Sequence, residues 1–290
     1  MSPAKFPSWH YIQMIMISPP PITTLSNGVS IPQLGLGTSH QGGYSEEAIK
    51  HALMVGCRHV DTAQRYGSEE GVGRAVRNAG LDRGEVFLTT KLWPDYYGIQ
   101  ACMEATSLSL SRLGTDYLDL YLMHWPGARN SGEISDTWRT MELLLERGKA
   151  RAIGVSNFQE RHLAKLLEEA SVVPHVNQIE FHPYQQDMNL INFCRERNIC
   201  VGGYSPLAKG RVLGDNVVEQ VAKEKGVTAA QVVIRWSLQR GVITIPKSTK
   251  VERVDENFNV LKFDLNSDQM SKLDSLHRNM RVTWDPSSVP

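Results

Sequence analysis

The sequence of 290 residues lacks the features that mark several specialised classes of protein. It has 31 basic and 31 acidic side chains, and therefore lacks the surplus of positive charge that binding to nucleic acid or to a membrane surface requires. It has only four cysteines, and none is spaced as a metal-ligand pair or as part of a disulfide framework. We therefore expect reduced thiols, no bound metal, a cytoplasmic location and small-molecule partners.

The first 21 residues lack the marks of a targeting signal. The apolar run Trp9-His-Tyr-Ile-Gln-Met-Ile-Met-Ile17 contains two polar residues, and it has neither the basic start nor the small-residue cleavage site of a signal peptide. Lys5 is the only lysine or arginine in this stretch, whereas a mitochondrial presequence is rich in arginine. Three prolines at 19–21 then interrupt the chain. We expect a flexible extension over residues 1–21 and a single domain over residues 22–290.

The rest of the chain alternates between short apolar runs and amphipathic helical patterns, which predicts a parallel sheet. Eight runs rich in Val, Ile and Leu occupy residues 33–37, 59–62, 86–92, 117–125, 151–156, 176–181, 200–204 and 242–246. Eight strand and helix units in about 250 residues predict an α/β fold of the (β/α)8 TIM-barrel type. Before the first unit, Ser26-Asn-Gly28 predicts a β-hairpin, and an extra helix at 215–225 precedes the helix at 229–240.

The competing architecture is an open doubly wound sheet that binds a dinucleotide. Such a sheet ordinarily carries G-x-G-x-x-G after its first strand, whereas this chain has Gly35-Leu-Gly-Thr-Ser-His40 there. Because this fingerprint is missing, we favour the closed barrel. The helix starts are also marked in the sequence, by Ser45-Glu-Glu47 and Ser68-Glu-Glu70, where a serine cap precedes two carboxylates.

Four residues that can move or orient a proton fall at or just after the ends of neighbouring predicted strands. These are Asp61, Tyr66, Lys91 and His124. In a barrel, the carboxyl ends of the strands form the active face. A charged Lys91 beside Tyr66 would favour the phenolate, Asp61 would keep Lys91 charged, and His124 would donate a hydrogen bond to a substrate oxygen. Taken alone, an aspartate at a strand end is often only a helix cap or an ion-pair partner, and a lone histidine after an apolar strand is more often a core residue. The joint occurrence of all four residues favours a catalytic role.

With these four residues the chain resembles the aldo-keto reductase family from Ile22 to Pro286. The matching stretches are residues 35–38 (GLGT), 59–63 (HVDTA), 66–67 (YG), 90–93 (TKLW), 123–126 (MHWP), 154–158 (GVSNF), 178–180 (QIE), 204–207 (YSPL) and 245–248 (IPKS), with Arg253, Glu256 and Asn257. The resemblance implies a barrel monomer that transfers hydride from NADPH to an aldehyde or ketone. It implies that Tyr66 is the general acid, that Lys91 and Asp61 lower its pKa, and that His124 positions the carbonyl.

The resemblance also implies where NADPH or NADP+ is held. The matching positions are Gly37, Thr38, Asp61, Ser156, Asn157, Gln178, Tyr204, Ser205, Pro206, Leu207, Lys247, Ser248, Arg253, Glu256 and Asn257. In such relatives Ser156, Asn157 and Gln178 would hold the carboxamide, Tyr204 would stack on the nicotinamide, and the residues on either side of Pro206 would line the pyrophosphate.

The phosphate end of this set decides which cofactor we expect. By the resemblance Lys247, Ser248 and Arg253 match the 2′-phosphate site, and Glu256 and Asn257 match the adenine contacts. A lysine and an arginine near a helix start form an anion pocket, which favours NADPH over NADH. The alternative is that the two cations belong to a solvated basic face.

The substrate pocket departs from the family pattern in its walls. Tyr66, Trp93, His124 and Trp125 are the expected lining, because rigid aromatic faces suit a mostly apolar pocket. Ser39 stands where many relatives have tryptophan, and the chain ends soon after residue 286. These features predict an open site for small carbonyl compounds. The alternatives are a redox-sensing regulatory subunit and a structural protein, both of which would bind NADPH with little turnover.

Overall fold

The structure is a computed structural model, and it describes residues 20–39, 42–127 and 131–289. The expected N-terminal extension lies almost wholly outside the described residues, so its flexibility stays a prediction. No helix within the described residues is both long and apolar enough to cross a membrane.

Eight parallel strands form the centre of the molecule, in the order in which they occur along the chain. They are β3 (Leu36–Gly37), β4 (His59–Asp61), β5 (Phe87–Leu92), β6 (Leu120–Met123), β7 (Ile153–Ser156), β8 (Val176–Glu180), β9 (Cys200–Tyr204) and β10 (Ile243–Ile245). Parallel bridges from Leu34 to Thr244 and from Gly37 to Lys247 join the first strand to the last. The expected (β/α)8 barrel is confirmed, and the doubly wound alternative is wrong because the sheet closes on itself without a reversal of strand order.

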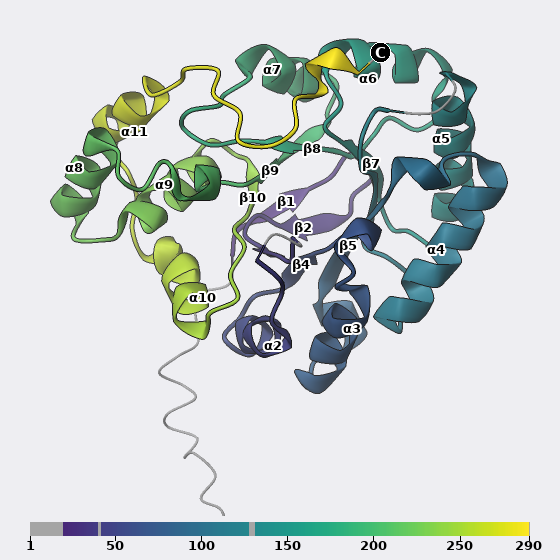
Figure 1. The fold of residues 1–290 in the computed structure, drawn as a ribbon, viewed down its shortest axis with the longest axis horizontal. Coiled ribbons are helices and arrows are strands. Elements are labelled where there is room, and N and C mark those ends of the chain that lie inside the picture. The colour runs from purple at the N-terminus through teal and green to yellow at the C-terminus, as the bar shows by residue number, and fades with distance from the viewer. Residues whose placement is uncertain (1–19, 40–41, 128–130, 290) are drawn as a thin grey trace, which may run out of the picture.

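Helices surround the strands, as Figure 1 shows. They are α2 (Glu46–Met54), α3 (Glu69–Asn78), α4 (Ile99–Leu113), α5 (Ser131–Glu146), α6 (Glu160–Glu169), α7 (Met188–Glu196), α8 (Asn216–Lys225), α9 (Ala229–Gln239), α10 (Val251–Phe258) and α11 (Ser267–Asp274). Both α8 and α9 lie between β9 and β10, which confirms the extra helix. Each helix turns an apolar stripe inward, and the ring of Trp236 from α9 stacks on Phe181 at 4.8 Å.

One of the two expected helix caps is present and the other is not. The Ser45 hydroxyl accepts a hydrogen bond from the Ala48 amide at 3.1 Å, which satisfies an amide at the start of α2. Ser68 precedes α3 but makes no capping bond, because its hydroxyl is buried and bonds instead to the Thr62 hydroxyl at 2.8 Å. Ser68 thus ties the start of α3 to the end of β4.

The expected hairpin closes the amino-terminal end of the barrel. Strands β1 (Ile22–Thr24) and β2 (Ser30–Pro32) pair antiparallel around a turn in which Gly28 has φ 84°, a value that favours glycine. Apolar residues of the hairpin join a core cluster with residues at the starts of several barrel strands: Leu25, Ile31, Phe87, Leu120, Val176 and Ile243. The opposite end of the barrel, where the strands finish, is therefore the end that is left open for a site.

Candidate active site

Three neighbouring strands deliver the predicted catalytic residues to the open end. Asp61 is the last residue of β4, Lys91 is the next to last of β5, and His124 directly follows β6. Tyr66 ends the short 3-10 helix Gln64–Tyr66 that leads from β4 towards α3. Because adjacent parallel strands end at one rim, residues separated by more than 60 positions meet there.

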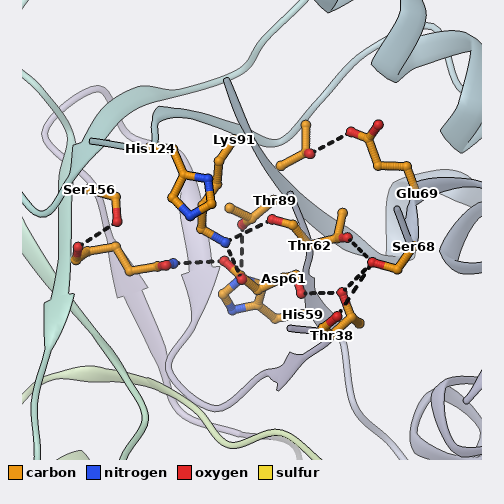
Figure 2. Close-up of polar contacts among 12 residues, drawn as sticks. Thr38, His59, Asp61, Thr62, Ser68, Glu69, Thr89, Lys91, His124 and Ser156 are labelled. Atoms are coloured by element: carbon orange, nitrogen blue, oxygen red, sulfur yellow. Dashed lines mark hydrogen bonds and ion pairs between the residues drawn. The ribbon is translucent and has the colours of Figure 1, made fainter. Parts of the chain in front are cut away.

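A buried ion pair forms the floor of this site. The Lys91 ammonium contacts Asp61 Oδ1 and also donates a hydrogen bond to the Thr62 carbonyl at 2.8 Å (Figure 2). Gln178 Nε2 donates to the other Asp61 oxygen at 2.7 Å. Burial lowers the pKa of Lys91, although Asp61 opposes that shift. Both Asp61 oxygens are occupied, so the carboxylate orients Lys91 and Gln178 together.

Tyr66 lies between this ion pair and the His124 ring. The Lys91 ammonium is 5.2 Å from the centre of the Tyr66 ring, and the Tyr66 and His124 rings meet edge to face at 5.6 Å. Burial, with a further contribution from Asp61, raises the pKa of Tyr66 above its ordinary value. The lowering of the pKa that the sequence suggested is therefore not seen, because burial disfavours the phenolate and the Asp61 carboxylate repels it. Tyr66 is held as a neutral phenol, which is the form that donates a proton.

His124 is held in place on two sides. Its ring packs edge to face against Trp93 at 5.3 Å, and its backbone carbonyl accepts a hydrogen bond from Asn157 Nδ2 at 3.0 Å. The residue is only 7% exposed, so the ring is a wall of the site and not a surface group.

A cavity of about 570 Å³ opens above these residues. Its lining includes these residues that the sequence predicted for catalysis, cofactor or substrate: Gly37, Asp61, Tyr66, Trp93, His124, Trp125, Ser156, Asn157, Gln178, Tyr204, Ser205 and Lys247. The structure thus brings the ends of all eight barrel strands to a single cavity, since these residues lie at, near or after the ends of β3 to β10.

The wall formed by β7, β9 and β10 has backbone conformations that are typical of a binding surface. Asn157, Ser205 and Lys209 all adopt positive φ, at 66°, 51° and 53°, in a region that residues other than glycine rarely occupy. Such conformations gather at ligand sites, where the surrounding structure compensates their cost. Gly37 lies directly beside this wall, because it is bridged to Lys247, and a Cβ there would lie 3.1 Å from the Ile245 carbonyl oxygen.

The polar groups of this wall are also connected to one another. The Tyr204 hydroxyl donates to Asn157 Oδ1 at 2.7 Å, and the Ser156 hydroxyl donates to the Gln178 carbonyl at 2.8 Å. These bonds fix the Asn157 amide and the Tyr204 ring at the edge of the cavity. The burial of Lys247 lowers its pKa, although its side chain still reaches the cavity.

The other residues of the predicted cofactor set do not line this cavity, so their roles stay predictions. They are Thr38, Pro206, Leu207, Ser248, Arg253, Glu256 and Asn257. The Thr38 hydroxyl donates to the Asp61 carbonyl at 3.1 Å, and the Ser248 hydroxyl donates to the Lys250 carbonyl at 2.9 Å. Arg253 is exposed on α10.

The segment after α11 supplies walls that the sequence did not predict. Val282, Thr283 and Trp284 line the cavity, and the edge of the exposed Trp284 ring meets Trp125 at 5.5 Å. Buried Glu180 holds this segment by accepting hydrogen bonds from the Val282 amide at 2.6 Å and the Thr283 amide at 3.0 Å. Only the tertiary structure could reveal this, because about 100 residues separate the partners.

A second cavity of about 630 Å³ adjoins the first and shares Trp93, Trp125 and Trp284 with it. Ser39, which the sequence placed at the pocket wall where many relatives have tryptophan, lines the first cavity, and so do Arg65, Lys209 and Ile245, which the sequence did not predict. Arg65 could have been found, because it stands directly before Tyr66. Among the described residues there is no group of histidine, cysteine and carboxylate side chains that could hold a metal ion.

Comparison with known proteins agrees with this geometry. The model of the Aldo/keto reductase family matches residues 33–278. A 9,11-endoperoxide prostaglandin H2 reductase from Trypanosoma cruzi is 43% identical over 91% of this chain and 94% of its own length. A glyoxal reductase from Bacillus subtilis is 43% identical over 91% and 96%. The crystal structure of a Bombyx mori aldo-keto reductase in complex with NADP superposes with a TM-score of 0.86 at 31% identity, over 92% of this chain and 95% of that one.

Proposed function

Because the chain belongs to the aldo/keto reductase family, we propose that it reduces small aldehydes and ketones to alcohols with NADPH, and that Tyr66 is the general acid. The observation that carries this proposal is the single cavity in which Tyr66 and His124 stand above the Lys91–Asp61 pair. A relative that reduces glyoxal and a structural neighbour solved with NADP support the same reaction class.

The residues of the nearby wall fit the nicotinamide end of the cofactor. Asn157 and Gln178 present amide groups, Ser156 presents a hydroxyl, and Tyr204 presents a ring beside them. Lys247 supplies a cation for a phosphate group. Bound NADPH supplies the hydride that reduces the carbonyl carbon.

The chain's own residues would then supply the proton. A carbonyl oxygen bonded to the Tyr66 hydroxyl and the His124 ring would gain negative charge as the carbon is reduced, and Tyr66 would transfer its proton to that oxygen. The buried Lys91 ammonium lies 5.2 Å from the centre of the Tyr66 ring and would stabilise the phenolate that remains. The raised pKa of Tyr66 keeps the acid protonated until then.

The test is the substitution Tyr66→Phe, which removes the hydroxyl and keeps the ring. We expect NADPH-dependent reduction of methylglyoxal, followed by NADPH absorbance, to fall by roughly a thousandfold, within the range of general acid catalysis. Binding of NADPH, followed by quenching of tryptophan fluorescence, should be retained.

Tyr96→Phe is the matched control, because Tyr96 is 42% exposed and does not line the cavity. Turnover by Tyr66→Phe at the wild-type rate would overturn the assignment of the acid. Tight NADPH binding without turnover in the wild type, across a panel of carbonyl compounds, would instead indicate a regulatory or structural role.

A further inference from the structure

Arg65 is a cation at the substrate end of the cavity, and neither the fold nor the proposed proton transfer accounts for it. Its guanidinium lies 4.9 Å from the centre of the Trp93 ring, in a cation–π arrangement. The other neighbour of that ring is His124, at 5.3 Å. The Trp93 ring therefore contacts both Arg65 and His124, the residue that would orient the carbonyl.

The charge of Arg65 is not balanced by a carboxylate of the described residues. Within the described ranges, no carboxylate lies within ion-pair distance of Arg65, whereas Asp61, the acidic residue that lines the same cavity, is engaged by Lys91 and Gln178. Asp95 and Asp285 line the second cavity and not the first. Among the residues that the structure describes, the substrate end of the first cavity thus presents a guanidinium group and no competing carboxylate.

We propose that Arg65 selects carbonyl substrates that carry a carboxylate, separated from the carbonyl group by a short apolar spacer. The guanidinium is planar and donates in pairs, which matches a carboxylate. Trp93 restricts the motion of Arg65, so less side-chain entropy is lost on binding. The spacer would lie along Trp93 while the carbonyl oxygen meets Tyr66 and His124. The inference rests on the proposed function and narrows its substrate class.

The test compares 4-carboxybenzaldehyde with 4-formylbenzamide, a neutral compound of nearly the same shape. The measured quantity is the ratio of their kcat/KM values with NADPH. We expect the ratio to exceed one in the wild type and to fall about tenfold in Arg65→Leu, through a higher KM for the carboxylated aldehyde. Arg65→Lys keeps the charge without the planar group, so an intermediate ratio is expected. The wild-type ratio should also decline as salt is added.

Arg147→Leu is the control for the change in net charge, because Arg147 is exposed at the end of α5, outside both cavities. That variant should keep the wild-type ratio. An unchanged ratio in Arg65→Leu, or an equal loss of activity on both aldehydes, would overturn the inference while the proposed function stands. Absence of turnover of either aldehyde by the wild type would overturn both.

Discussion

At the scale of the residue, the site is built from charges that are partly removed from water. Lys91 is 1% exposed and Asp61 is 2% exposed, so each depends on the other for its charge. Burial also raises the pKa of Tyr66, so the phenol is neutral and its loss of a proton requires stabilisation of the phenolate. Lys247 differs from Lys91 in that its side chain lines the cavity.

Lys247→Met should weaken binding of NADPH more than binding of NADH, because only NADPH carries the additional phosphate. A charge-assisted hydrogen bond to phosphate contributes on the order of 2 kcal/mol, so we expect the KM for NADPH to rise roughly 30-fold. The measurement is the KM for each cofactor at a saturating aldehyde concentration.

Lys165→Met is the matched control, because Lys165 is exposed on α6 and does not line the cavity. Equal effects of Lys247→Met on the two cofactors would contradict the assignment of Lys247 to the phosphate.

At the scale of the element, the segment after α11 is joined to the barrel by a buried carboxylate. Glu180, at the end of β8, accepts hydrogen bonds from His182 Nε2 at 2.9 Å and from Val282 and Thr283. Burial raises the pKa of Glu180, but these bonds outweigh burial and leave the pKa below its ordinary value. Figure 1 shows the segment, in yellow, running from α11 towards α6. A short segment without regular structure thus becomes a fixed wall of the cavity.

Glu180→Gln should loosen this wall, because an amide offers one acceptor oxygen where the carboxylate offers two. We expect the free energy of unfolding to fall by about 2 kcal/mol, and the Val282 and Thr283 amides to exchange hydrogen faster than in the wild type. Urea unfolding and hydrogen exchange are the measurements.

Glu196→Gln on α7 is the control, because its side chain is 74% exposed and its ion pair with Arg197 is a surface contact. Unchanged exchange at Val282 and Thr283 would show that Glu180 does not hold the segment.

At the scale of the whole molecule, the barrel contains histidines that must stay neutral. His59 in β4 is 2% exposed, with its ring between the Pro32 carbonyl at 3.2 Å and the Thr89 hydroxyl at 3.0 Å. Burial lowers the pKa of His59, and burial also lowers the pKa of His175. In the unfolded chain both would titrate near the ordinary value of about 6.5.

The stability of the protein should therefore fall as the pH drops below about 6.5. In that range the unfolded chain binds protons that the folded chain excludes, so the free energy of unfolding falls by on the order of 1 kcal/mol per pH unit for each histidine. Urea unfolding between pH 5 and pH 8 measures this slope. His59→Gln should be less stable than the wild type at pH 8 but should have a shallower decline; an equally steep decline would contradict the role of His59.

Much of the architecture is determined by the sequence alone. The eight apolar runs, the turn at Ser26-Asn-Gly28 and the extra helix before residue 229 are local patterns, and each appears in the structure as expected. The sequence also predicted that the four residues at the strand ends lie together, because a barrel brings the ends of its strands to one rim whatever the conformation of its loops.

Only the tertiary structure decided how those residues behave and what surrounds them. The pKa of Tyr66 depends on how deeply the phenol is buried, and burial is a property of the packed molecule. Ser68 was expected to cap a helix, yet its position beside Thr62 recruits its hydroxyl elsewhere. Arg65 stands in the short 3-10 helix after β4, and Trp284 stands in the segment after α11, whose path depends on distant contacts such as those of Glu180. Short-range patterns fix strands and helices, whereas the shape and charge of a cavity arise from segments that meet only on folding.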